Sequence, residues 1–505
     1  MTLSGHFDPR VSRKVCGGVL SAALHVGLLL VILSGGRHDG MHAVDAPISM
    51  FLLLESREAD RSDVVEVPLP EPALPTPASE DQLHASTVRL TPPPAVAIAP
   101  EPAEFTPLNE PPTEVIEPIS ISDGEIPATL AMSDAEKATL AQRLERLAEE
   151  SLDAFRTEAT WQQDGKQYSA VLIRERANDG TALERVIAQV STSDRGKYLT
   201  TIVNLRRLAF SQFAQVVDRW DPMVQLHDDE IVGRFHSNSQ LKLKYDSRTA
   251  PKFHGKVTTA ARSFNTESHV RKRDSDIFRG GRETRAGRIE LPESVQPFDW
   301  APKDEDARIH EFTSDVHIRF FRDGSYTWRT RESIESAYNE PSEHPVYFVA
   351  GPQTTLYVQG VVAGRVLIYS PQRIVIEGSL TYASDPRDAP DSGDYVGLVS
   401  NKYVEVAPPG VTGPGDLEID AAIFAGRRFV VTNIDHRRTA TLRIYGSLAA
   451  RSLSATEPRY ATKIEYDSRF EHQRPPGFPS TNRHEAADWD GQWVEATERN
   501  VDDSL

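Results

Sequence analysis

The chain has 505 residues, a formal net charge of −18 and 35 prolines. This acidity argues against nucleic acid as a partner, because phosphate binding needs a basic face. The single cysteine, Cys16, excludes an intramolecular disulfide and a thiolate metal cluster. The sequence has no nucleophile elbow, phosphate-binding glycine loop or zinc-protease motif, so it indicates neither a cofactor nor a metal.

The amino-terminal region contains an uncharged run. Residues 15–34 carry no charged side chain, and roughly 20 apolar residues span a bilayer core. Basic residues within 1–14 precede the run, so this segment is predicted to be a cytoplasmic tail. We therefore expect a single-pass protein of the bacterial cytoplasmic (inner) membrane, with the bulk of the chain in the periplasm. Cleavage of the run as a signal peptide is the alternative.

One face of this expected transmembrane helix carries Gly18, Ser21, Ala22 and His25. Small residues let a second membrane helix approach closely, and an ionisable residue within a span usually faces a protein partner. These four residues are predicted to contact a membrane partner. A histidine that merely hydrogen-bonds a neighbour within the span is the alternative.

A Pro-rich stretch follows the run. Residues 35–131 include 15 of the 35 prolines between 68 and 127, and such a composition predicts a disordered tether. The S-x-x-x-H spacing of Ser21 and His25, followed by this tether, resembles the anchor of TonB-type energy transducers. The resemblance implies contact with ExbB/ExbD-like membrane proteins that form a proton-driven motor.

The next segment, 132–160, is predicted to be an amphipathic helix. Ser133 and Glu136 form a capping box, and apolar residues at helical spacing extend the helix over 134–157. An α/β lead-in over 161–225 follows. It is expected to hold strands at 168–174 and 185–192 and a helix at 205–220.

Residues 226–495 contain many short β-rich runs that end at Gly, Asn or Ser. Val358-Gln359-Gly360 and Ile376-Glu377-Gly378 recur at a spacing of 18. The pattern predicts a mainly β fold, a right-handed parallel β-helix (solenoid), with a β-sandwich as the alternative. A polar stretch over about 262–344 is interpreted as an insertion with a hairpin at Asp323-Gly324, and 496–505 as a disordered tail.

Several sequence blocks occur in order through this region and resemble a bacterial family of β-helical domains found in PilX-like pilus-assembly and cell-surface proteins. The resemblance implies a β-helix that takes part in the assembly of pili or other surface structures. The blocks are D228-D-E-I-V-G-R-F-H-S-N-S239, P251-K-F-H-G-K-V-T258, V375-I-E-G-S-L-T-Y382, G397-L-V-S-N401, I419-D-A-A-I423, Y466-D-S-R469 and P475-P-G-F-P479, with Trp489 or Trp493 near the end.

Candidate ligand-face residues lie in the first two blocks: Asp228, Asp229, His236, Asn238 and His254. Adjacent carboxylates on a strand point to opposite faces, so the Asp228-Asp229 run does not by itself form a catalytic pair. His236 and Asn238, at i and i+2, are expected to hydrogen-bond each other or turn backbone.

Three histidines and Asp420 are the remaining polar candidates. His227, His236 and His254 lack the close spacing of a metal site. Asp420 is expected to end a turn or to link polar groups between β-helix turns.

The sequence therefore favours a non-enzymatic envelope protein that presents a binding or assembly domain to an envelope protein or polymer. A TonB-like energy transducer and a polysaccharide-active β-helix enzyme are the alternatives.

Overall fold

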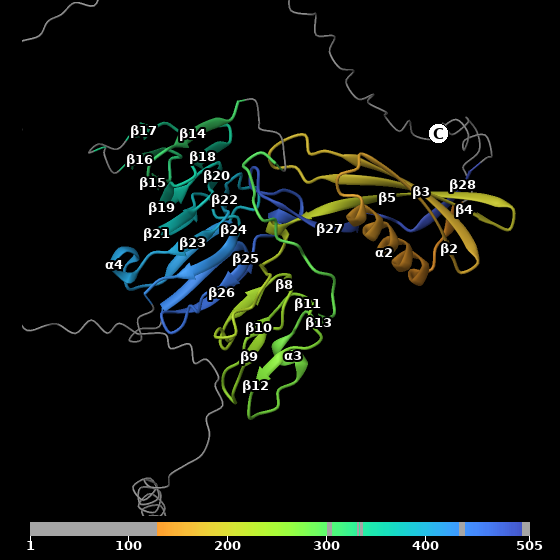
Figure 1. Ribbon diagram of the computed structural model, residues 1–505, viewed down its shortest axis with the longest axis horizontal. Coiled ribbons are helices and arrows are strands. Elements are labelled where there is room, and N and C mark those ends of the chain that lie inside the picture. Colours follow the sequence, from red (N-terminus) through yellow and green to blue (C-terminus); the bar gives the residue numbers. More distant parts are fainter. Residues whose placement is uncertain (1–128, 300–305, 331–332, 334–336, 434–439, 497–505) are drawn as a thin grey trace, which may run out of the picture. The chain divides into compact units, whose positions relative to one another are not determined.

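The computed structural model describes residues 129–299, 306–330, 333, 337–433 and 440–496. These residues are mainly β, as expected. They form two large sheets, one antiparallel and one almost entirely parallel (Figure 1).

The antiparallel sheet combines strands from both ends of the described chain. Its strand order is β1-β28-β5-β4-β3-β2, and β27 also pairs with β5. The strands at residues 168–174 and 185–192 are confirmed as β3 and β4. The bounds are β1 Thr129–Ala131, β2 Arg156–Gln163, β3 Lys166–Glu175, β4 Arg185–Asp194, β5 Lys197–Ala209, β27 Ser480–Ala487 and β28 Gln492–Ala496.

Helix α2 (Asp134–Glu150) packs on this sheet. The hydroxyl of Ser133 accepts a hydrogen bond from the backbone N–H of Glu136 at 3.2 Å, which confirms the predicted amino-terminal cap. The buried face of the helix includes Leu140 and Leu144, which belong to the core beneath the sheet. The helix ends earlier than predicted, because β2 begins at residue 156 and joins the sheet.

The predicted helix over 205–220 is wrong. Residues up to Ala209 continue β5, and the chain then forms the short 3₁₀ turn η1 (Phe210–Gln212) and strand β6 (Gln215–Val217). The apolar spacing that resembles a helix has another origin. Leu205 packs in the core under α2, whereas Leu208 and Phe213 pack in a different core.

The second sheet contains a continuous row of ten parallel strands, in which the order in space differs from the order along the chain. Strand β25, near the end of the chain, pairs with β6, the first strand of the region. The row runs β14 (Arg308–Phe312), β18 (Val346–Ala350), β20 (Arg365–Ser370), β22 (Tyr395–Ser400), β24 (Leu417–Val431), β25 (Ala440–Leu453), β6, β8 (Phe235–Ser237), β11 (Val257–Thr259) and β13 (Arg282–Thr284).

Two further rows of parallel pairs share the long strands β24 and β25. The first is β15 (Val316–Phe320), β19 (Thr355–Val362), β21 (Arg373–Tyr382), β23 (Tyr403–Val406), β24 and β25. The second is β21, β24, β25, β26 (Tyr460–Tyr466), β7 (Glu230–Val232) and β10 (Lys252–Phe253). Strands β9 (Lys242–Lys244) and β12 (Asn265–Glu267) form a separate parallel pair.

The register agrees with the repeat read from the sequence. Val358 lies opposite Ile376 in the parallel pair β19–β21, and both side chains are fully buried. Parallel pairing of this kind differs from the antiparallel pairing of the β-sandwich alternative.

The hairpin at Asp323-Gly324 is confirmed as β15 paired antiparallel with β16 (Tyr326–Thr330), which continues to β17 (Ala337–Asn339). The interpretation of 262–344 as a separate insertion is corrected. Strands β13, β14 and β15 from this stretch are members of the parallel rows, and α3 (Asp274–Ile277) also lies within it. A charged sequence hid these strands, because many of their side chains are at least partly exposed.

The predicted location in the cytoplasmic membrane is corrected. Within the part of the chain that the structure describes, no helix is both long enough and apolar enough to cross a bilayer. The longest of them, α2, has the sequence DAEKATLAQRLERLAEE and carries charge along its whole length. The segments 1–14, 15–34 and most of 35–131 lie outside the described residues, whereas 129–131 form β1 instead of a disordered tether.

Candidate functional site

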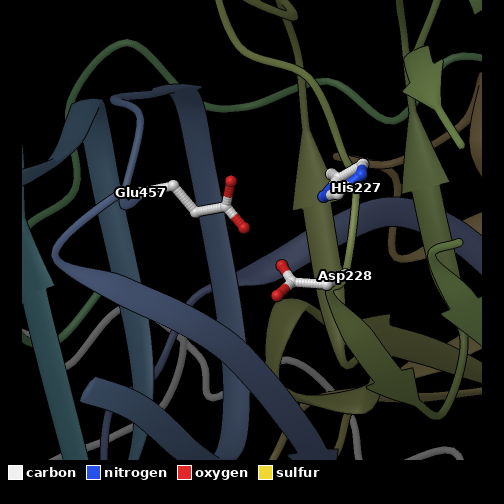
Figure 2. Close-up of side chains that lie close together, drawn as sticks. All are labelled: His227, Asp228 and Glu457. Atoms are coloured by element: carbon white, nitrogen blue, oxygen red, sulfur yellow. The ribbon is translucent and has the colours of Figure 1, made fainter. Parts of the chain in front are cut away.

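Three polar side chains from distant parts of the chain lie close together beside the pairing of β26 with β7. Donor atoms of His227, Asp228 and Glu457 all lie within 4.8 Å of one another. Figure 2 shows the carboxylates of Asp228 and Glu457 pointing toward each other from different segments.

The fold explains this convergence. His227 and Asp228 lie in the turn that leads into β7, and Glu457 lies in the turn between β25 and β26. Strand β26 pairs in parallel with β7, so the turns that lead into the two strands are neighbours. We call the pairing of β25 with β6 and of β26 with β7 the seam. It joins residues 215–284 to residues 308–466.

Burial and mutual repulsion shape the electrostatics of this cluster. Burial, with the hydrogen bond to Asp228 and the negative charges of Asp228 and Asp229, raises the pKa of Glu457 to about 8. Burial, followed by the charge of Asp228, raises the pKa of Asp229 to about 7, although the backbone N–H of His227 donates to Asp229 Oδ2 at 3.1 Å. Near neutral pH the cluster therefore retains a proton between carboxyl groups.

A small pocket adjoins the cluster. Its volume is about 60 Å³, and its lining is mostly apolar. Asp229 and Glu457 reach it, and so does Gln215, whose side chain is 3% exposed. Within the described part of the chain, Gln215 Oε1 has no hydrogen-bond partner. The seam thus contains a buried polar atom that is left unsatisfied.

Of the predicted ligand-face residues, Asp228 and Asp229 lie at the seam, and the others do not join them. His236 is 2% exposed in β8, and its Nε2 donates to Asn238 Oδ1 at 2.9 Å, while Nδ1 contacts Thr258 Oγ1 at 2.8 Å. Burial lowers the pKa of His236 to about 4. The expected His236–Asn238 hydrogen bond is confirmed.

Asn238 is held on its other side as well. Its amide nitrogen donates to Asp218 Oδ1 at 3.0 Å and to the carbonyl of Ile289 at 2.6 Å. This amide orientation makes Asn238 Oδ1 an acceptor only, so His236 Nε2 carries the proton. Hydrogen bonds thus connect this pair to Thr258, Asp218 and Ile289 in other parts of the fold.

His254 and Asp420 also have internal partners. His254 Nε2 lies 2.9 Å from Glu230 Oε1. Asp420, in β24, accepts a hydrogen bond from the backbone N–H of Tyr382 in β21 at 3.0 Å, which confirms that it links neighbouring strands. Burial raises the pKa of Asp420 to about 6. His227, His236 and His254 do not form one metal site.

The residues Gly18, Ser21, Ala22 and His25 lie outside the described residues. Glu457 was missed by sequence reasoning. It is a single carboxylate in the turn T-E-P, and only the pairing of β26 with β7 brings it to Asp228.

Together these features define a mainly β protein whose antiparallel sheet carries a region of parallel strands. No protein family matches the chain, and no curated protein matches it. Among solved structures, the chain is similar to the competence-associated pilin ComZ from Thermus thermophilus. The identity is 11%, the TM-score is 0.25, and the alignment covers 72% of this chain and 96% of that one. Neither a fold nor a function is carried over at this level of similarity.

Proposed function

We propose that residues 210–479 form a right-handed parallel β-helix. Three rows of parallel strands share β24 and β25, as expected when one chain winds past several sheets in turn. Glycines support close stacking of successive turns. A Cβ on Gly255 would lie 2.0 Å from the carbonyl oxygen of Gly233, and one on Gly280 would lie 2.3 Å from the carbonyl carbon of Gly255. The right hand is the general preference for parallel crossovers.

We further propose that this β-helix is a non-enzymatic binding or assembly module for pili or other surface structures. The observation that carries the proposal is the internal use of the polar groups that had suggested catalysis. His236, Asn238, His254 and Asp420 all bond to other parts of the fold. The ordered sequence blocks that resemble PilX-like proteins fall in the same region and support the choice of partner class.

At the seam, the size of the pocket supports binding through an outer face. Its volume of about 60 Å³ is well below the roughly 300–1,000 Å³ of sites that enclose small ligands. Stacked repeats instead offer extended outer faces to large partners. A protein or polymer of a surface structure fits such a face better than a small molecule does.

The way in which residues 210–479 are attached to the antiparallel sheet allows them to be removed as a test of the proposal. Ala209 in β5 lies opposite Ser480 in β27. The chain therefore leaves the antiparallel sheet after Ala209 and returns to it at Ser480, so residues 210–479 are attached to the sheet at two neighbouring positions. A short Gly-Ser linker between these two residues should preserve the sheet. In the native host, a strain with this variant should lose assembled surface fibres in electron micrographs, while its protein retains β structure by circular dichroism.

As a control, the same linker is inserted beside Gly415, where a Cβ would meet no atom within 4 Å. This variant should assemble fibres normally. Normal fibre numbers without residues 210–479 would contradict the assembly role.

The enzyme alternative has its own test. Asp228 and Glu457 are a carboxyl pair, and the raised pKa of Glu457 is a property of many general acids. The full chain is incubated with peptidoglycan and with surface glycans, and soluble fragments are measured. Fragment release that disappears in Asp228→Asn would replace the binding proposal with a glycan-cleaving one. The TonB-like alternative depends on residues outside the described part of the chain.

A further inference from the structure

The cluster at the seam has the donor set of a cation site. His227 supplies an imidazole nitrogen, and Asp228 and Glu457 supply carboxylate oxygens, all within 4.8 Å of one another. This spread is about twice the 2.0–2.4 Å that separates a divalent cation from its nitrogen and oxygen ligands. One ion can therefore contact all three donors after small side-chain adjustments.

The backbone around the donors is already organised. The N–H of His227 donates to Asp229 Oδ2 at 3.1 Å, which fixes the turn that presents His227 and Asp228. Asp246 Oδ2 lies 3.9 Å from His227 Nε2. A carboxylate next to a ligating imidazole is a common means of orienting its ring.

A second observation also points to a missing ligand at the seam. Gln215 is 97% buried, since only 3% of it is exposed, and its Oε1 lacks a partner among the described residues. This side chain lines the pocket that Glu457 and Asp229 also line. A buried carbonyl oxygen without a donor is costly, so the pocket beside the cluster contains a polar atom that the described residues leave unsatisfied.

We propose that His227, Asp228 and Glu457 bind one divalent transition-metal cation of the Zn²⁺ class. Imidazole as one of three ligands favours Zn²⁺ over Ca²⁺, Mg²⁺ and Mn²⁺, which prefer sites built of oxygen ligands. Two carboxylates neutralise the charge of the ion, and water completes its coordination.

The position of the site indicates its role. The ion connects the turn before β7 to the turn before β26, and these strands pair across the seam. Residues 215–284 and 308–466 are thereby fastened together by a contact that is independent of their apolar packing. The site is structural, so the inference does not rest on the proposed function in surface assembly.

The test uses the purified full chain, stripped with a chelator and titrated with ZnCl₂ in a calorimeter. We expect one ion per chain and a rise of several degrees in the thermal midpoint, because a ligand that binds only the folded state stabilises it. Glu457→Gln and Asp228→Asn keep the side-chain shape but remove a charged ligand. Each should weaken Zn²⁺ binding by at least about tenfold.

His317→Gln is the matched control, since His317 forms a separate histidine–carboxylate pair with Glu377 at 2.9 Å. This variant should bind Zn²⁺ as the unmodified chain does. His227→Gln provides a third ligand variant if a carboxyl variant fails to fold. Titrations with MnCl₂ and CaCl₂ test the metal class.

Three results would overturn the proposal. They are the absence of Zn²⁺ binding, Zn²⁺ binding that survives the Glu457→Gln and His227→Gln changes, and tighter binding of Ca²⁺ than of Zn²⁺. Co²⁺ absorption bands that are present in the unmodified chain and lost in Glu457→Gln would confirm the assignment spectroscopically.

Discussion

Ile464 of β26 lies in register with Ile231 of β7, although one is near the end of the parallel region and the other near its beginning. Both side chains are 2% exposed and belong to the same core. Apolar contact therefore joins an early strand of the region to its last strand, and the polar cluster of His227, Asp228 and Glu457 lies beside that contact.

This seam should be sensitive to side-chain truncation. Ile464→Ala removes buried methyl groups and leaves a cavity, so we expect the free energy of unfolding to fall by about 2–5 kcal/mol. Val232→Ala, on the partner strand, is the control, because Val232 is 39% exposed and its truncation should cost less than about 1 kcal/mol. Urea denaturation measures both. Equal, small effects would show that the seam contributes little to stability.

Two ion pairs, each between residues two apart in the sequence, allow the stability contributions of a buried and an exposed pair to be compared. Asp467 is paired with Arg469 at 2.6 Å, and the side chains are 0% and 10% exposed; Asp385 is paired with Arg387 at 2.7 Å, and these are 32% and 40% exposed. Asp467→Asn leaves a buried guanidinium unpaired, so we expect a loss of about 3–5 kcal/mol.

Asp385→Asn should cost less than about 1 kcal/mol, because solvent screens the exposed pair. The stacking of Arg469 over Tyr382 and Tyr395 should also be disturbed only by the Asp467 change, which near-ultraviolet circular dichroism can detect. A larger loss from Asp385→Asn than from Asp467→Asn would reverse this ranking.

Close stacking of β24 and β25 makes one glycine essential. Gly446 has φ +138°, and a Cβ there would lie 2.2 Å from the carbonyl oxygen of Ala421. Gly446→Ala should therefore lower the free energy of unfolding by about 2–5 kcal/mol through strain and overpacking. Gly415→Ala, with nothing within 4 Å of its Cβ, should be neutral or stabilising by a few tenths. Thermal unfolding of the two variants compares them, and a neutral Gly446→Ala would exclude the tight contact.

The buried imidazole of His236 should make stability depend on pH. Its folded-state pKa is lowered to about 4, mainly by burial, whereas the unfolded value is about 6.5. Between these values the unfolded chain binds a proton that the folded chain does not, so stability falls as the pH drops from about 6.5 to about 4. The free energy of unfolding should fall by up to about 1.4 kcal/mol per pH unit in this range.

His236→Gln removes this titration while an amide donor remains for Asn238. Urea unfolding at several pH values should give a shallower decline for this variant than for the unmodified chain. An unchanged slope would mean that His236 is protonated in the fold.

Local patterns in the sequence were sufficient to predict several strands, the start of a helix and a hairpin. Short runs rich in apolar residues predicted β3 and β4, a serine three residues before a glutamate predicted the start of α2, and Asp323-Gly324 predicted the β15–β16 hairpin. Each depends on residues close together in the chain, where backbone preference and side-chain spacing act directly.

Only the tertiary structure decided the rest. Glu457 meets Asp228 because β26 pairs with β7, and Leu205 and Leu208 enter different cores because the chain passes from one sheet to the other between them. Strands with similar apolar patterns can pair in many orders, and the order adopted depends on which buried faces fit together across hundreds of residues. The sequence alone therefore determined a mainly β chain with short strands, whereas long-range packing decided the seam and the cluster beside it.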